Sequence, residues 1–134
     1  MKSLNLKQIL GILFMAAIAF TACSKKDSIP APQATIEGSW LGKYGTGNNA
    51  PATFYSFSIL KGGVLELRSK ENNITGTGTW ELDGETFTAK YKYNVGFAKY
   101  NMAAKYNANA KTLTGSWGSG DTVADDGEFF LNKQ

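Results

Sequence analysis

Short segments in which polar and apolar residues alternate dominate the chain from residue 36 onward. In one of them, Phe87, Ala89 and Tyr91 alternate with the polar Thr88 and Lys90. A period of two residues places the apolar side chains on one face of a strand and the polar ones in water, as in an antiparallel sheet. The segments show no sustained helical periodicity. The pattern predicts eight strands, at residues 36–44, 52–60, 64–69, 74–82, 85–93, 97–106, 111–118 and 127–132.

The connections between these predicted strands are short and rich in turn residues. The pair Asp83-Gly84 between two alternating segments predicts a type I′ hairpin turn, which requires positive φ angles. Short connections leave no room for crossovers, so successive strands are expected to pair in order. Closure of such a meander removes its two exposed edges. We therefore predict an all-β fold, an eight-stranded antiparallel up-and-down barrel that forms a single domain at 36–134.

A glycine, a small hydroxyl residue and a tryptophan recur three times, at Gly38-Ser39-Trp40, Gly78-Thr79-Trp80 and Gly115-Ser116-Trp117. The first resembles the Gly-x-Trp of the calycin group, which comprises lipocalins and avidins, and the last resembles the Gly-x-Trp phrases of avidin-like barrels. The resemblance implies a calycin-like barrel in which tryptophan packs across the closed end. Glycine would permit strong strand curvature beside it. The expected barrel-end residues are Gly38, Trp40, Trp80 and Trp117.

The N-terminal segment has the layout of a secretory signal. Lys2 and Lys7 precede an apolar run at residues 9–20, and Cys23, the only cysteine of the chain, follows it closely. The run suits the apolar region of a signal peptide and is short for a membrane span, which needs about 20 residues. An ordinary signal peptide with an incidental cysteine is the alternative interpretation.

Phe20-Thr21-Ala22-Cys23-Ser24 resembles a bacterial lipobox, although Phe20 replaces the usual leucine. The resemblance implies a lipoprotein signal peptide at 1–22, cleavage before Cys23, and acyl chains such as palmitate on that cysteine. Residues 23–35 would then form a lipid-anchored flexible tether, and residues 24–28 resemble segments found in lipoproteins of the Bacteroidota. Because Ser24 rather than aspartate follows Cys23, the resemblance implies a cell-envelope location at the outer membrane.

The composition excludes several chemistries. The chain has no histidine and one cysteine, which removes Ser–His and Cys–His catalysis, an internal disulfide and a multi-thiolate zinc site. Asp121, Asp125 and Asp126 lack EF-hand spacing and are expected to be solvated. The net charge of +3 falls when Lys2 and Lys7 leave with the signal peptide, which gives no electrostatic footprint for nucleic acid or acidic lipid. We expect no enzyme activity, metal or cofactor.

Tyrosine is abundant among the apolar positions of the predicted strands, and buried tyrosine hydroxyls need hydrogen-bonding partners. A semi-polar interior follows, and small inward residues such as Ala89 and Ala104 would leave space between the rings. The leading hypothesis is a binding module that holds a small, partly apolar ligand at the open end of the barrel. An equally simple interpretation is that the rings fill a narrow barrel. The candidate lining residues are Tyr55, Phe57, Tyr91, Tyr100, Met102 and Tyr106.

A second hypothesis assigns the function to the loops. Small barrels of the cell envelope can present their connections to a protein partner, as a structural module or as an enzyme inhibitor. The longest predicted loops, at 45–50 and 119–126, are the expected contact surfaces.

Overall fold

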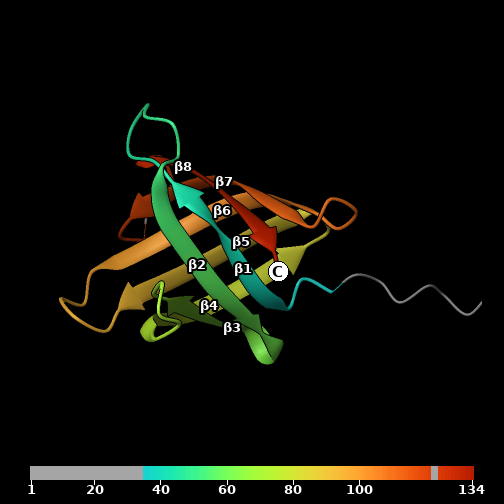
Figure 1. Ribbon diagram of the computed structural model, residues 1–134, viewed down its shortest axis with the longest axis horizontal. Coiled ribbons are helices and arrows are strands. Elements are labelled where there is room, and N and C mark those ends of the chain that lie inside the picture. Colours follow the sequence, from blue (N-terminus) through green and yellow to red (C-terminus); the bar gives the residue numbers. More distant parts are fainter. Residues whose placement is uncertain (1–34, 122–123) are drawn as a thin grey trace, which may run out of the picture. The chain divides into compact units, whose positions relative to one another are not determined.

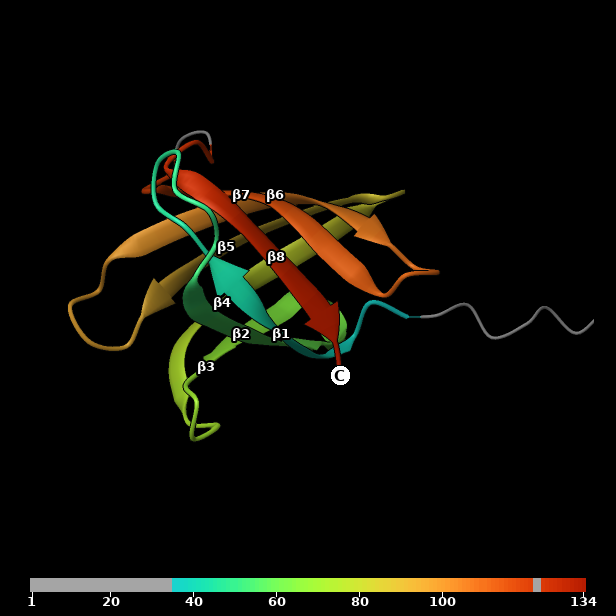
Figure 2. The same cartoon turned by 45° about the horizontal axis from the view of Figure 1, so that its top comes forward.

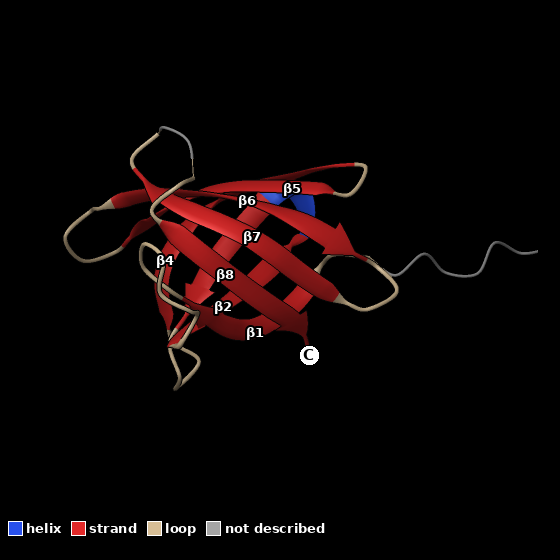
Figure 3. Ribbon diagram, turned by 90° about the horizontal axis from the view of Figure 1, so that it is seen from above, coloured by secondary structure: helices blue, strands red, loops and turns tan. Residues whose placement is uncertain are grey.

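The computed structural model describes residues 35–121 and 124–134, and these form one closed antiparallel barrel. Each strand pairs with the next along the chain, and β8 pairs with β1 to close the sheet (Figures 1 and 3). This confirms the predicted up-and-down barrel, and the predicted strand ends lie within two residues of the observed ones. The elements are β1 (Gly38–Tyr44), β2 (Thr53–Leu60), the short 3-10 helix η1 (Lys61–Gly63), β3 (Val64–Arg68), β4 (Ile74–Asp83), β5 (Thr86–Tyr93), β6 (Lys99–Asn107), β7 (Thr112–Ser119) and β8 (Gly127–Lys133).

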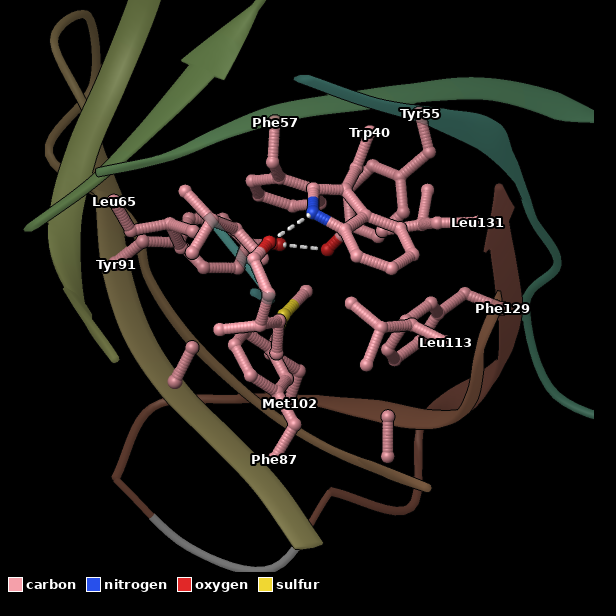
Figure 4. Packing of buried hydrophobic residues seen from close by; sticks show 14 of the residues in the cluster. Trp40, Tyr55, Phe57, Leu65, Phe87, Tyr91, Met102, Leu113, Phe129 and Leu131 are labelled. Atoms are coloured by element: carbon pink, nitrogen blue, oxygen red, sulfur yellow. Dashed lines mark hydrogen bonds between the residues drawn. The ribbon is translucent and has the colours of Figure 1, made fainter. Parts of the chain in front are cut away.

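The signal peptide predicted at 1–22, Cys23 and the tether at 23–35 lie outside the described residues, apart from Thr35. In the described barrel the alternation has the predicted orientation. On β5, Phe87, Ala89 and Tyr91 are buried, whereas Thr88 and Lys90 between them are exposed. Figure 4 shows the buried side chains meeting inside the barrel.

The barrel has two chemically different ends. The odd-numbered strands finish, and the even-numbered strands begin, at one end, which we call the mouth; the other end is the base. The connections at 45–52, 69–73 and 94–98 lie at the mouth, together with the connection between β7 and β8. The base carries η1, the turn at 84–85 and the turn at 108–111. Figure 2 shows the longer connections at the mouth.

Two tryptophans close the base. Trp40 is fully buried, and its indole N–H donates to the backbone carbonyl of Ile36 at 2.8 Å. Ile36 belongs to no strand, because β1 begins at Gly38, and its buried side chain joins the core at this end. Trp80 stacks on Phe87 and donates its indole N–H to the Leu60 carbonyl at 2.8 Å. Both indoles are therefore fixed by backbone acceptors at the base.

The glycines of the second and third Gly-x-Trp phrases allow neighbouring strands to approach closely. A Cβ atom on Gly78 would lie 2.0 Å from the Lys90 carbonyl oxygen, and one on Gly115 would lie 2.0 Å from that of Ala103. Both contacts are with backbone, which cannot move aside without disturbing the sheet. The role of glycine at these positions is thus to make room for the adjacent strand.

The hairpin predicted at Asp83-Gly84 is present, but the predicted type I′ turn was wrong in two respects. Asp83 still belongs to β4 and pairs with Thr86, so the two loop residues are Gly84 and Glu85. Gly84 has a φ of +59°, whereas Glu85 does not have a positive φ. A hairpin with a positive φ at its first central residue alone is of the II′ kind, for which glycine at that position is typical.

The predicted strand at 97–106 was also too long at its start. β6 begins at Lys99, and Phe97 lies in the β5–β6 connection with a φ of +55°. The inward positions of β6 are Tyr100, Met102 and their even-numbered successors, so a strand extended back to Phe97 would have pointed this ring outward. The ring therefore had no place in the core that could hold residue 97 in the strand.

We predict that Gly78→Ala and Gly115→Ala each destabilise the barrel by about 1–3 kcal/mol, because the added methyl forces adjacent backbones apart. Urea unfolding followed by circular dichroism measures this change. Thr114→Ser, on the exposed face one residue from Gly115, is the control and is expected to change stability by no more than about 0.5 kcal/mol. Equal stabilities of Gly115→Ala and the control would contradict the close-approach explanation.

Candidate functional site at the barrel mouth

Six aromatic side chains meet at the mouth and enclose a cavity of about 70 Å³. Five strands supply them: β1, β2, β5, β6 and β7. Two of the rings are buried and form the floor, and four are half-buried and form the rim. We call this set the mouth cluster: Tyr44, Tyr55, Tyr91, Tyr93, Tyr100 and Trp117.

The rings of the mouth cluster contact one another around the barrel. Tyr44 lies between Tyr55 and Trp117, with ring centroids 5.0 and 5.6 Å away. On the other side, Tyr100 lies 5.9 Å from Trp117 and 5.5 Å from Tyr91. Edge-to-face and offset contacts of this kind add roughly 0.5–1.5 kcal/mol each beyond the burial of their area. The cluster is therefore a closed and mutually supported set of rings.

A hydrogen bond between Tyr55 and Tyr91 completes the circuit. Their hydroxyl oxygens are 2.5 Å apart, and both residues are buried (Figure 4). Burial is the largest cause that raises the pKa of each hydroxyl, to well above the usual range for Tyr55. The pKa of Tyr93 on the rim is raised by the same cause. These hydroxyls are consequently neutral donors and acceptors at ordinary pH.

Two loops are joined to each other beside the cluster. The indole N–H of Trp117 donates to the carbonyl of Gly45 at 2.8 Å, and the backbone N–H of Gly47 donates to the carbonyl of Asp126 at 2.6 Å. The Asp126 carboxylate accepts the Ser119 backbone N–H at 2.6 Å, and hydrogen bonding from Ser119 lowers the pKa of Asp126. The connections β1–β2 and β7–β8 are thus hydrogen-bonded to each other at the rim.

The structure separates the predicted lining residues. Tyr55, Tyr91 and Tyr100 belong to the mouth cluster, and Phe57 packs directly beneath it, with its ring 4.5 Å from that of Tyr55 and 5.7 Å from that of Tyr91. Met102 is buried in the core and does not line the cavity. Tyr106 lies at the base, where its ring is 6.0 Å from that of Trp40.

The expected barrel-end residues also divide between the two ends. Gly38, Trp40 and Trp80 lie toward the base, whereas Trp117 lies at the mouth and lines the cavity. Gly38 has a φ of +137°, a conformation that favours glycine at the start of β1. Sequence reasoning therefore missed Trp117, Tyr44 and Tyr93 as cavity residues. The direction of each strand was the available signal, because it places the last residues of β1, β5 and β7 at one end.

The cavity is uncharged and small. No lysine, arginine, aspartate or glutamate lines it, and its volume of about 70 Å³ is far below the roughly 300 Å³ at which pockets for whole ligands begin. Larger hollows, of about 520 and 340 Å³, lie on the outside of the barrel against outward-facing residues such as Thr79 and Lys90. The mouth cluster can thus accept one compact group of a ligand and hydrogen-bond it through tyrosine hydroxyls.

Residues 35–121 and 124–134 contain no group of three or more histidine, cysteine, aspartate or glutamate side chains placed to hold a metal ion. Within the same ranges, no helix has the length and apolar character needed to cross a membrane. No protein-family model, curated protein or solved structure matches this chain.

Stability is expected to fall above about pH 10 because of the buried tyrosines. Tyr55 and Tyr91 have folded-state pKa values above the unfolded value of about 10, so the fold favours their neutral forms. Their contribution is fully present below about pH 10 and is lost as the pH rises toward the folded-state values. Chemical unfolding at a series of alkaline pH values measures the fall, and Tyr55→Phe, which lacks the ionisable group, should show a shallower one. Identical slopes for wild type and variant would contradict this account.

Proposed function

We propose that this protein is a binding module of the cell envelope that takes a small, uncharged, partly apolar group of a ligand into its mouth cluster. The observation that carries the proposal is the convergence of six aromatic side chains from five strands on one cavity. A barrel of eight strands can be filled by side chains alone, and the lower part of this one is filled in that way. At the mouth, by contrast, the side chains of the mouth cluster leave a cavity between them.

The chemistry of the lining defines the ligand group. Aromatic faces and edges favour apolar or planar groups, and the tyrosine hydroxyls both donate and accept hydrogen bonds. Because no charged side chain lines the cavity, an ion would lose its hydration without gaining a counter-charge. A neutral group of a few heavy atoms, such as a ring hydroxyl or a short alcohol, fits these constraints. The remainder of the ligand would lie on the rim.

The sequence supports the lipoprotein part of the proposal. The segment 20–24 resembles a lipobox, and the acyl chains on Cys23 would hold the barrel at a bilayer, with roughly 0.8 kcal/mol gained per buried methylene. The calycin-like assignment is supported by Trp40, whose indole closes the base as the Gly-x-Trp resemblance implies. We propose the outer membrane as the location. We also propose binding rather than catalysis, since the chain contains no histidine.

Binding at the mouth is tested with a panel of small neutral probes, including phenol, cyclohexanol and a neutral hexose, added to residues 24–134. Amide chemical shifts of Tyr55, Tyr91 and Tyr100 are expected to move saturably with at least one probe. Tyr100→Phe removes a rim hydroxyl and should weaken binding about fivefold if that hydroxyl bonds the probe, since a hydrogen bond contributes about 1 kcal/mol. Tyr106→Phe is the matched control at the base and should leave the affinity unchanged.

A panel without any response at the mouth would overturn this assignment. The alternative is the envelope protein-interaction module or enzyme inhibitor, and one observation favours it: the loop at 45–50 is bonded to the β7–β8 connection, because the Gly47 backbone N–H donates to the Asp126 carbonyl at 2.6 Å. A protein partner whose binding depends on residues 45–50, with no probe bound at the mouth, would establish that function instead.

The anchor has its own test. Expressed in a bacterium that processes lipoproteins, the wild-type protein should enter the detergent phase on phase separation and carry acyl mass on its mature N-terminus. Cys23→Ser lacks the acylated sulfur and should remain in the aqueous phase. A mature wild-type protein of unmodified mass would show that the leader is an ordinary signal peptide.

A further inference from the structure

The β5–β6 connection exposes two large apolar side chains at the mouth end. Val95 is 88% exposed and Phe97 is 72% exposed, the highest values among the exposed large hydrophobic residues of the described ranges. We call residues 94–98 the β5–β6 tip; it projects from the barrel at the left of Figures 1 and 2. Two large apolar side chains this exposed, two residues apart on one short loop, are a candidate for contact with an apolar partner.

Hydrogen bonds hold both ends of the tip. The Tyr93 backbone N–H donates to the Ala98 carbonyl at 3.2 Å, and the Asn94 backbone N–H donates to the Thr75 carbonyl at 2.9 Å. The Asn94 side chain donates to the Ile74 carbonyl at 3.3 Å. These bonds attach the tip to the start of β4, where the side chain of Ile74 is also exposed. The first residue of the tip is therefore held against β4, and the exposed Val95 and Phe97 follow it directly.

The backbone at Phe97 is unfavourable for its side chain. Its φ of +55° lies in the left-handed region, where a bulky residue is uncommon and glycine or asparagine costs less. Gly96 before it has a φ of +81°, so the chain uses glycine at one of the two positions and keeps the ring at the other. A ring held in a strained conformation and directed into water indicates a function outside the core.

Lysines lie on the outer face of the two strands that carry the tip. Lys92 and Lys99 are direct cross-strand partners with both side chains exposed, and Lys90 follows along β5. Like charges placed opposite each other destabilise a sheet. The ion pairs among the described residues are Arg68–Glu66 and Lys105–Glu85, so none of the three has a carboxylate at ion-pair distance. Asp121 lines the same outer hollow without pairing with them at that distance.

An exposed apolar loop next to a group of lysines is suited to binding a lipid surface rather than a protein. A stable protein interface buries about 800 Å² on each partner, far more than two side chains on a narrow loop present. A bilayer interface needs only a few inserted apolar groups, and its anionic headgroups attract nearby lysines at about 1 kcal/mol each. We propose that the β5–β6 tip inserts Val95 and Phe97 into an anionic bilayer surface while Lys92 and Lys99 bind headgroup phosphates.

The insertion does not depend on the acyl chains of Cys23, but both contacts can be made with one membrane. Thr35 lies at the base, and an extended chain reaches about 3.3–3.6 Å per residue, so residues 23–35 can span roughly 40 Å. β4, the longest strand, has 10 residues and extends over about 33 Å. The tether is thus long enough to pass along the barrel. Acyl chains on Cys23 would raise the effective concentration of the tip at the membrane surface. Weak insertion of the tip would then be enough to hold this end of the barrel at the bilayer.

The test uses residues 24–134, which contain every strand and the whole described core and lack the acylated cysteine. Flotation with vesicles of phosphatidylglycerol and phosphatidylcholine in about equal parts is compared with phosphatidylcholine alone. Wild type should bind the anionic vesicles more strongly. Val95→Ser with Phe97→Ser should lower the partition coefficient at least about tenfold. Lys92→Gln with Lys99→Gln should remove most of the dependence on anionic lipid and on salt.

Leu60→Ser with Val64→Ser is the matched control, because both side chains are exposed apolar residues near the base end. This control should bind vesicles as wild type does, and circular dichroism checks that every variant is folded. If the wild-type protein binds the anionic vesicles no more strongly than the Val95→Ser with Phe97→Ser variant does, the proposal is overturned. The tip would then be a contact surface for a protein partner. An equal loss in the base control would likewise overturn it. Probe binding at the mouth is measured without lipid, so the two proposals fail separately.

Discussion

The pairing of β1 with β8 is the interaction on which the rest of the structure depends. Trp40 to Tyr44 align with Lys133 to Phe129, and this register converts a meander of eight strands into a sheet without edges. It also brings Tyr44 on β1 to Trp117 on β7, two residues far apart in the sequence. The circuit of rings at the mouth exists only because the sheet closes. Architecture and candidate site therefore share one cause.

Closure of the sheet requires strongly twisted and bent strands, and side chains must fill the interior that the closed sheet encloses. Gly78 and Gly115 allow neighbouring backbones to approach, while large rings such as Phe57 and Phe87 occupy the space inside. At the base, an indole and the side chain of Ile36 complete the packing. Five of the six tyrosines line the mouth and one, Tyr106, lies at the base, so the polarity of the interior increases toward the mouth loops. This gradient is what makes the mouth, rather than the centre, the candidate site.

Much of the fold follows from the sequence because burial on one face of a strand dictates alternation. Phe87, Ala89 and Tyr91 could be assigned to the interior without coordinates, and so could the strand order. Strand direction also indicates the end toward which a residue lies, and it separates Tyr106, near the end of β6, from Tyr55, near the start of β2. The exact height along the barrel axis depends in addition on the stagger of the strands, which the alternation does not give. The strand predicted at 97–106 includes Phe97, but its odd position relative to Tyr100 places it on the outward face, which is a signal against a strand held there by burial. A small net charge likewise concealed the local grouping of Lys92 with Lys99.

The base also joins the two ends of the described chain. The ammonium group of Lys133 donates to the carbonyl of Thr35, and the backbone N–H of Gln134 donates to the carbonyl of Ser39 at 2.9 Å. The strands form a closed cycle in which every strand has two neighbours, and β1 pairs with β8. The barrel is therefore expected to tolerate circular permutation. A short linker across the base and a new opening in a connection such as 69–73 would preserve every strand pair. A domain fused after Gln134 would likewise leave from the base, with the opposite end unobstructed.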